Sequence, residues 1–191
     1  MEDKIANLKE QCREKIKLKQ KSLEIQEMRE SDTAIALKVS SLKEFSQAKV
    51  IFIFVSTKEE INTAPMIEKA WELGKRVVVP KCMDKGRMEA YEIQSFLDLE
   101  EGFWGILEPK DNSLLISPHE IDLAIIPCLS CDRKLNRLGK GGGYYDRYLE
   151  HASFVKAALC RESLLLHKVP VDVWDQKVDM VITEKEIYKS E

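Results

Sequence analysis

The residues with the clearest chemical signature lie between Asn136 and Leu149, where the sequence reads NRLGKGGGYYDRYL. Four of the eight glycines of the chain fall between Gly139 and Gly143. Glycine lets the backbone adopt positive φ and approach a ligand closely, so a glycine cluster can present successive N–H groups to an anion. We therefore interpret this turn as a candidate phosphate site, and we expect a helix beginning near Tyr144 to add its unpaired N–H groups.

Charged side chains surround this turn. The nearby cations are Arg133, Lys134, Arg137, Lys140 and Arg147. Asp146 is the exception, because a carboxylate beside a bound phosphate repels it unless a cation lies between them. Mg²⁺ is the usual cation where nucleotide phosphates bind, so Asp146 is a candidate magnesium ligand.

A glycine cluster is often only a turn, and composition alone leaves that alternative open. Two sharper alternatives fail on spacing. Neither Ser nor Thr follows Lys140, so the G-x-x-x-x-G-K-[ST] pattern of P-loop proteins is absent. The G-x-G-x-x-G dinucleotide fingerprint is also unmet, since Tyr144 stands where its last glycine should be.

The segment IPCLSCDRKLNRLGKGGGYYDRYL, residues 126–149, resembles the signature of the 5-formyltetrahydrofolate cyclo-ligase family, also called methenyltetrahydrofolate synthetase. The resemblance extends over almost the whole chain. Its weaker pieces are the Lys9 and Arg13 pair and residues 53–63, 104–109 and 177–184.

The resemblance implies an enzyme of one-carbon metabolism that uses ATP and Mg²⁺. The reaction would convert 5-formyltetrahydrofolate to 5,10-methenyltetrahydrofolate, releasing ADP and phosphate, through phosphorylation of the formyl oxygen. The alternative is a non-catalytic or divergent nucleotide-binding relative that acts on another formylated substrate. Residues 161–164 read RESL, where many relatives carry an aromatic residue and then a glutamine. That departure keeps the alternative open.

The resemblance also implies roles for individual residues. The ATP contacts would be Lys9, Arg13, Arg137, Leu138, Gly139, Lys140, Gly141, Gly142, Gly143, Tyr144 and Tyr145, with Lys140 and Arg137 acting in catalysis. The folate contacts would be Val55, Glu60, Trp104, Lys140 and Tyr144, with Lys81 near the anionic tail. Asp146 and Asp179 would bind magnesium. For Glu60, Trp104 and Asp179 the alternatives are a solvated charge, an ordinary core residue, and a structural salt bridge or outward strand position.

Length and composition agree with a small enzyme. The 191 residues suit one domain, 1–191, with 44% hydrophobic and 33% charged residues. A net charge of -3 argues against a nucleic-acid partner. No apolar run reaches membrane-span length and the N-terminus lacks a signal-peptide pattern, so we expect a cytoplasmic monomer with small-molecule substrates.

Five cysteines, an odd number, predict free thiols in a reducing compartment. We expect Cys12, Cys82 and Cys160 to be small buried residues. Cys128 and Cys131 form a lone C-x-x-C, which leaves open a redox pair or half of a zinc site. No second C-x-x-C or suitably spaced histidine pair completes such a zinc site.

The spacing of apolar residues predicts helices that alternate with strands. A first amphipathic helix is expected to bury Ile5, Leu8, Cys12 and Ile16. A second helix, capped by Ser31 or Asp32, should bury Ile35, Val39 and Leu42. Thr63 is expected to cap a third helix, which has Pro65 near its first turn and ends at Gly74. Strands are expected at 50–55, 76–79, 87–93, 123–126, 154–159 and 178–182, and an exposed loop at 108–120.

This order predicts a single-domain, three-layer α/β/α fold with a mostly parallel open sheet. Ligands of such sheets bind at the carboxyl ends of the strands, where Ser56, Lys81, Pro127 and Thr183 are expected.

Overall fold

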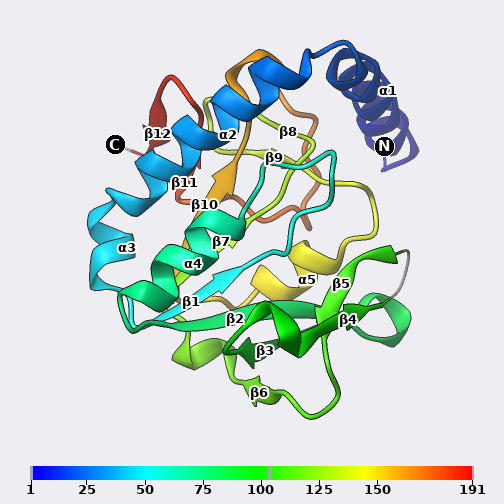
Figure 1. The fold of residues 1–191 in the computed structure, drawn as a ribbon. Helices are drawn as coiled ribbons and strands as arrows, with labels where there is room; N and C mark the ends of the chain where they lie inside the picture. Colours follow the sequence, from blue (N-terminus) through cyan, green and yellow to red (C-terminus); the bar gives the residue numbers. More distant parts are fainter. Residues whose placement is uncertain (1, 103–104, 191) are drawn as a thin grey trace.

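An eight-stranded mixed sheet forms the centre of the molecule in the computed structural model, which describes residues 2–102 and 105–190 (Figure 1). From one edge to the other its strands are β12 (Ile187–Lys189), β11 (Met180–Ile182), β10 (Val155–Leu159), β7 (Leu123–Ile126), β1 (Val50–Ile53), β2 (Arg76–Cys82), β3 (Met88–Ile93) and β6 (Leu114–Ile116). The five from β11 to β2 run parallel, and β12, β3 and β6 are antiparallel to their neighbours. The predicted α/β class with a mostly parallel sheet is confirmed.

Helices cover both faces of this sheet (Figure 1). The helices α2 (Ile25–Ser40), α3 (Lys43–Gln47) and α4 (Ala64–Glu72) pack on one face, while α5 (Tyr144–Leu149) packs on the other. Along β1, Ile51 and Ile53 contact the first layer, and Val50 and Phe52 contact the second. A strand that is buried on both faces needs apolar residues at every position, which explains the unbroken VIFI run.

The predicted strands are present, with the predicted ends at 123–126 and shifted ends elsewhere. The strand predicted at 76–79 continues to Cys82 and includes Pro80, which the sequence-based prediction excluded. Pairing with β1 stops at Val78, so the rest of β2 pairs only with β3. A proline is tolerated there because one side of the strand needs no ladder N–H.

The expectation of an exposed loop at 108–120 is correct for exposure, since most of these residues are exposed, but wrong for the absence of regular structure. This region contains the end of β5 (Leu107–Pro109), the whole of β6 and the 3-10 turn η4 (Pro118–Glu120). β5 pairs with β4 (Leu99–Glu101), and Ile116 of β6 pairs with Ala90 of β3. Ile116 is 3% exposed, so its side chain closes the edge of the core. The remaining short elements are β8 (Ser130–Cys131), β9 (Arg137–Leu138), η1 (Asp84–Gly86), η2 (Phe96–Asp98) and η5 (Glu162–Leu164).

The first helix, α1 (Glu2–Lys21), is longer than its buried stripe. Ile16 is 2% exposed and packs in the core, whereas Leu8 is 41% exposed. Figure 1 shows α1 standing at one side of the body of the molecule. The helix therefore packs in the core through Ile16, while Lys9 and Arg13 join it to other segments by polar contacts.

The second helix begins earlier than predicted. Its N-cap is Glu24, so Ser31 and Asp32 lie inside the helix and do not cap it. Ser31 donates to Glu184 Oε2 at 3.2 Å, and Asp32 Oδ1 accepts from Arg161 Nη2 at 2.5 Å. Residues that resemble a cap in sequence are used here for tertiary contacts.

The third helix that the sequence predicted is α4. It starts after Thr63 and is followed by Gly74 at φ +68°, as predicted. Thr63 makes no side-chain cap. Its hydroxyl instead donates to the Phe54 carbonyl at 2.7 Å and accepts from the Ser56 N–H at 3.2 Å. Thr63 therefore holds the loop that leaves β1 against the start of α4.

None of the helices in the part of the chain that the structure describes has the length and apolar character needed to span a bilayer.

We expect Thr63→Val to lower the free energy of unfolding by about 1–3 kcal/mol, because the buried Phe54 carbonyl and Ser56 N–H both lose their partner. Urea denaturation measures the change. Thr33→Val is the matched control, since the Thr33 hydroxyl bonds only the Arg29 carbonyl on an exposed helix face. Equal effects at both positions would contradict the role given to Thr63.

Candidate functional site

The glycine turn connects β9 to α5. Gly141 has φ +104°, and Gly143, the N-cap of α5, has φ +67°. Both values lie in the region that residues with a Cβ rarely adopt, so glycine is required at these two positions. The helix begins at Tyr144 as predicted, but it spans only six residues. Side-chain cations therefore contribute more to the anion-binding character of this turn than the helix does.

A buried carboxylate shapes the hairpin that precedes the turn. Asp132 is fully buried, and its carboxylate accepts hydrogen bonds from the N–H groups of Lys134, Asn136 and Val169 and from Asn136 Nδ2, at 2.9–3.1 Å. These donors replace the counter-cation that a buried anion otherwise needs. Leu135, at the tip, has φ +67°. Our sequence analysis missed Asp132, although an Asp that opens a four-residue turn is a recognisable signal.

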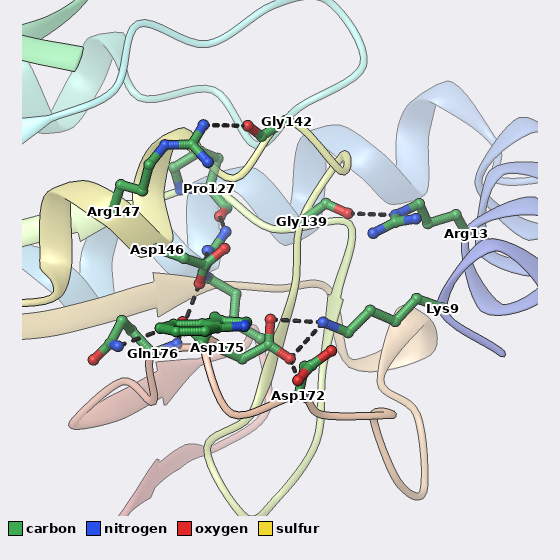
Figure 2. A network of polar contacts seen from close by, with 12 residues as sticks. Lys9, Arg13, Pro127, Gly139, Gly142, Asp146, Arg147, Asp172, Asp175 and Gln176 are labelled. Atoms are coloured by element: carbon green, nitrogen blue, oxygen red, sulfur yellow. Dashed lines mark hydrogen bonds and ion pairs between the residues drawn. The ribbon is translucent and has the colours of Figure 1, made fainter. Parts of the chain in front are cut away.

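The helix α1 brings two cations to this region (Figure 2). Arg13 Nε donates to the Gly139 carbonyl at 3.0 Å, and Arg13 also forms an ion pair with Glu10 at 2.8 Å. Lys9 Nζ lies 2.5 Å from Asp175 Oδ2, so Lys9 holds the segment after Val169 and does not contact the turn. The structure therefore brings Arg13 to the glycine turn, whereas Lys9 contacts Asp175 in the segment that precedes β11.

Arg137 is the buried cation beneath the turn, with a side chain only 3% exposed. Its Nη2 donates to Asp146 Oδ1 at 2.9 Å, and its Nη1 donates to the Pro127 carbonyl at 3.4 Å. Its Cζ lies 5.5 Å from the centre of the Tyr145 ring. Asp146 Oδ1 also accepts from the Gln176 N–H at 3.2 Å. This network joins the carboxyl end of β7, the helix α5 and the segment before β11.

Lys140 faces the loop that follows β1. Its Nζ lies 2.8 Å from Glu60 Oε1, although the two residues are 80 positions apart. Glu60 Oε2 accepts from the Thr57 N–H at 2.9 Å and the Thr57 hydroxyl at 3.0 Å. Val55, in the same loop, is partly buried against the core. The fold thus brings Lys140 to Glu60, while the folate roles of Lys140, Glu60 and Val55 stay predictions.

A small chamber lies under this loop, at the carboxyl ends of β1, β7 and β10. Its enclosed volume is about 30 Å³, and its walls include Phe54, Glu60, Pro127, Lys140, Leu159 and Arg161. The chain continues from β1 to β2 on one side and places β7 on the other, so the chamber lies at the point where the strand order reverses. Ligands of open α/β sheets bind in this crevice.

The tyrosines after the turn pack into the protein. Tyr145 meets Phe52 edge to face at 6.3 Å between ring centres, and burial raises the pKa of the Tyr145 hydroxyl well above its ordinary value. Tyr144 is partly buried in the same layer, with Arg147 Cζ 5.8 Å from its ring centre. Trp104, predicted to contact folate, lies outside the described residues.

Asp179 occupies a different place from the one predicted. It precedes β11 and is 48% exposed, so it does not interrupt a buried strand. Its Oδ2 accepts from the Lys156 N–H at 2.7 Å, as Asp122 Oδ2 accepts from the Val50 N–H at 2.9 Å. Both aspartates bind backbone amides at the amino ends of parallel strands. The assignment of Asp146 and Asp179 as magnesium ligands stays a prediction, and no group of three or more His, Cys, Asp or Glu residues suited to a metal occurs among the described residues.

Lys81 lies in a second cleft, of about 350 Å³, between β2 and the β4–β5 hairpin. Its Nζ donates to Asp111 at 2.7 Å and to the Pro109 carbonyl at 2.8 Å. The cleft also carries Glu100, Glu101 and Glu108. Three carboxylates repel an anionic folate tail, so the geometry disfavours the role expected for Lys81.

Three of the five cysteines lie together: Cys131 and Cys160 are buried and Cys128 is partly buried. Cys128 Sγ lies 3.4 Å from Cys131 Sγ and donates to the Leu159 carbonyl at 3.0 Å, and Cys160 borders both. Burial and mutual contact raise the pKa of all three thiols well above the ordinary value. Cys160 is buried as predicted, whereas Cys12 and Cys82 are only partly buried. The raised pKa values disfavour the redox alternative, since the thiolate is the reactive form.

A mostly parallel α/β sheet with a cation-lined glycine turn at its carboxyl edge is typical of proteins that bind small phosphorylated ligands. The sequence model of the 5-formyltetrahydrofolate cyclo-ligase family matches residues 5–184. This chain belongs to that family.

Individual relatives agree along most of their length. The probable 5-formyltetrahydrofolate cyclo-ligase of Schizosaccharomyces pombe is 32% identical, with 82% of this chain and 85% of the relative covered. The 5-formyltetrahydrofolate cyclo-ligase of Escherichia coli K12 is 27% identical, with coverage of 91% and 99%. The structure of Aquifex aeolicus 5,10-methenyltetrahydrofolate synthetase superposes with a TM-score of 0.85 at 28% identity, covering 95% of this chain and 92% of that one.

We expect Asp146→Asn to lower the free energy of unfolding of the ligand-free protein by about 1–3 kcal/mol, because it leaves the buried Arg137 guanidinium without its anion. Asp179→Asn is the matched control. Its amide oxygen can still accept from the Lys156 N–H, so the change should stay within about 0.5 kcal/mol. Denaturant titrations of both variants test this, and equal stabilities would contradict the structural role of Asp146.

The thiols give a test that depends on pH. Burial raises the pKa of Cys82 to about 11, so below that pH the reactive thiolate is a minor form, about one part in a thousand at pH 8. We expect Cys82, Cys128, Cys131 and Cys160 to react slowly with Ellman's reagent in the folded protein, and the rate at Cys82 to rise about tenfold per pH unit. Fast native-state labelling of Cys128 or Cys131 at pH 8 would restore the redox interpretation.

Proposed function

We propose that this chain catalyses the ATP-dependent cyclisation of 5-formyltetrahydrofolate to 5,10-methenyltetrahydrofolate, with release of ADP and phosphate. Membership of the 5-formyltetrahydrofolate cyclo-ligase family supports the choice of reaction. The observation that carries it is the presence of three cations around the glycine turn, with Arg13 coming from α1, Arg137 from β9 and Lys140 from the turn itself.

The chemistry explains why phosphate must be bound. A formyl amide is a poor electrophile, because its nitrogen donates into the carbonyl, and its oxygen is a poor leaving group. Transfer of the γ-phosphoryl group of ATP to the formyl oxygen turns that oxygen into a good leaving group. The neighbouring secondary amine of the folate then attacks the activated carbon, and phosphate leaves as the five-membered ring forms. No protein nucleophile takes part, so the protein contributes position and charge.

Lys140 and Arg137 supply the charge in this scheme. Lys140 is 57% exposed and pairs with Glu60, so the phosphates of ATP can attract its ammonium away from Glu60 at little cost. Arg137 remains buried below the turn, and its Nε has no hydrogen-bond partner among the described residues. A donor in this position stabilises negative charge that grows on the transferred group.

Asp146 suits a magnesium ion in this scheme. Mg²⁺ in nucleotide sites typically binds one or two carboxylates together with phosphate oxygens and water. Asp146 is 24% exposed, and only its Oδ1 has a hydrogen-bond donor among the described residues, which leaves Oδ2 available. When bound, the ion would neutralise phosphate charge and orient the triphosphate. Asp146 would hold it and Arg137 would orient Asp146.

Glu60 and the chamber suit the pteridine ring of the folate. Release of Lys140 leaves Glu60 Oε1 free to accept hydrogen bonds from ring N–H groups. The chamber, at about 30 Å³, is far below the roughly 300 Å³ typical of small-molecule sites. Binding of the ring would therefore require the chamber to widen, which the loss of the Lys140–Glu60 ion pair would favour.

The direct test is to mix the protein with 5-formyltetrahydrofolate and Mg-ATP and to follow the absorbance of the methenyl product. Lys140→Met should reduce kcat on the order of a hundredfold and change ATP affinity less, because the ammonium acts on charge that develops during transfer. Lys43→Met, which removes an exposed lysine from α3, is the control and should leave kcat unchanged. Absence of product together with absence of folate binding in the unaltered protein would overturn the proposal.

A further inference from the structure

Arg161 is a buried cation that the reaction scheme above does not use. It follows β10 at the carboxyl edge of the sheet, and its side chain is 4% exposed. It borders the chamber together with Glu60 and Lys140. Charged side chains are rarely buried to this extent unless paired or used for binding.

The partners of Arg161 account for only part of its guanidinium. Its Nη2 lies 2.5 Å from Asp32 Oδ1 and 3.5 Å from the Glu60 carbonyl. Its Nε is buried and has no acceptor among the described residues. A buried donor without an acceptor costs about 1–3 kcal/mol, so an acceptor supplied by a ligand would be favoured at this position.

Arg161 places a hydrogen-bond donor, its guanidinium, next to a hydrogen-bond acceptor, the carboxylate of Glu60. The contact with the Glu60 carbonyl holds the guanidinium beside the residue whose carboxylate faces Lys140. The pyrimidinone edge of a reduced pterin carries the complementary set: a carbonyl oxygen that accepts, followed by a ring N–H and an amino group that donate. A guanidinium and a carboxylate side by side can bind that edge with three hydrogen bonds.

We propose that Arg161 donates to the 4-oxo group of the pteridine while Glu60 accepts from the adjacent N–H groups, so that Arg161 determines the specificity of the chamber for 4-oxo pteridines. This inference rests on the proposed function, because it takes a reduced folate as the ligand. Asp32 positions Arg161 through their ion pair and through its own bond from the Asn62 N–H at 3.2 Å.

The experiment compares two ligands in the absence of ATP, by calorimetry: 5-formyltetrahydrofolate and its 2,4-diamino analogue, in which the 4-oxo acceptor is replaced by an amino donor. The unaltered protein should bind the 4-oxo ligand about tenfold or more tightly, since the analogue turns a donor–acceptor pair into two facing donors. The absence of this preference overturns the inference without any variant.

A pair of variants isolates the guanidinium. Asp32→Asn breaks the ion pair and keeps Arg161, whereas the double variant Asp32→Asn with Arg161→Met removes both charges and leaves no unpaired anion. The preference for the 4-oxo ligand should persist in the first and fall to near unity in the second, while ATP affinity is equal in both. A preference that survives the loss of Arg161 overturns this inference but does not affect the proposed function. Failure of the unaltered protein to bind 5-formyltetrahydrofolate overturns the proposed function as well.

Discussion

The buried ion pair between Arg137 and Asp146 is the contact on which the arrangement of the site depends. It joins the hairpin strand β9 to α5, and Arg137 also holds the Pro127 carbonyl at the end of β7. A buried ion pair adds little net stability, because desolvation of the two charges offsets their attraction. Its value here is positional. It keeps a guanidinium beneath a glycine turn where phosphate charge would develop, and it leaves one carboxylate oxygen of Asp146 open.

The sequence predicted the centre of the fold well because local physics determines it. Strands buried on both faces need continuous apolar runs, and β1 and β7 carry them at the predicted positions. The glycine turn was also predictable, since positive φ at Gly141 and Gly143 restricts the residue type. The errors lie at the edges. Pro80 is acceptable in β2 only because the pairing of β2 with β1 ends at Val78. Ser31 and Asp32 resemble a helix cap in sequence, but their side chains contact Glu184 and Arg161 instead.

Contacts between distant residues could not be read from local patterns. The Asp32–Arg161 pair spans 129 positions, and nothing near either residue announces the other. Asp179 illustrates the opposite error. An aspartate within an apolar segment suggests a costly buried charge, but the strand starts one residue later and the carboxylate is half exposed. The same arrangement at Asp122 indicates that an aspartate before an apolar run can mark the start of a parallel strand.

The two ion pairs at the glycine turn differ in burial, and this difference separates their roles. The Arg137 side chain is 3% exposed, so removing its anion would leave an uncompensated charge, and the pair must persist through any reaction. The Lys140 side chain is 57% exposed, and exposed pairs contribute about 0–1 kcal/mol. Lys140 and Glu60 can therefore part at little cost when each meets a better partner, a phosphate for the ammonium and ring N–H groups for the carboxylate. Under the proposed function, either ligand alone would remove one member of the pair and free the residue that the other ligand requires, so the pair would couple the two sites.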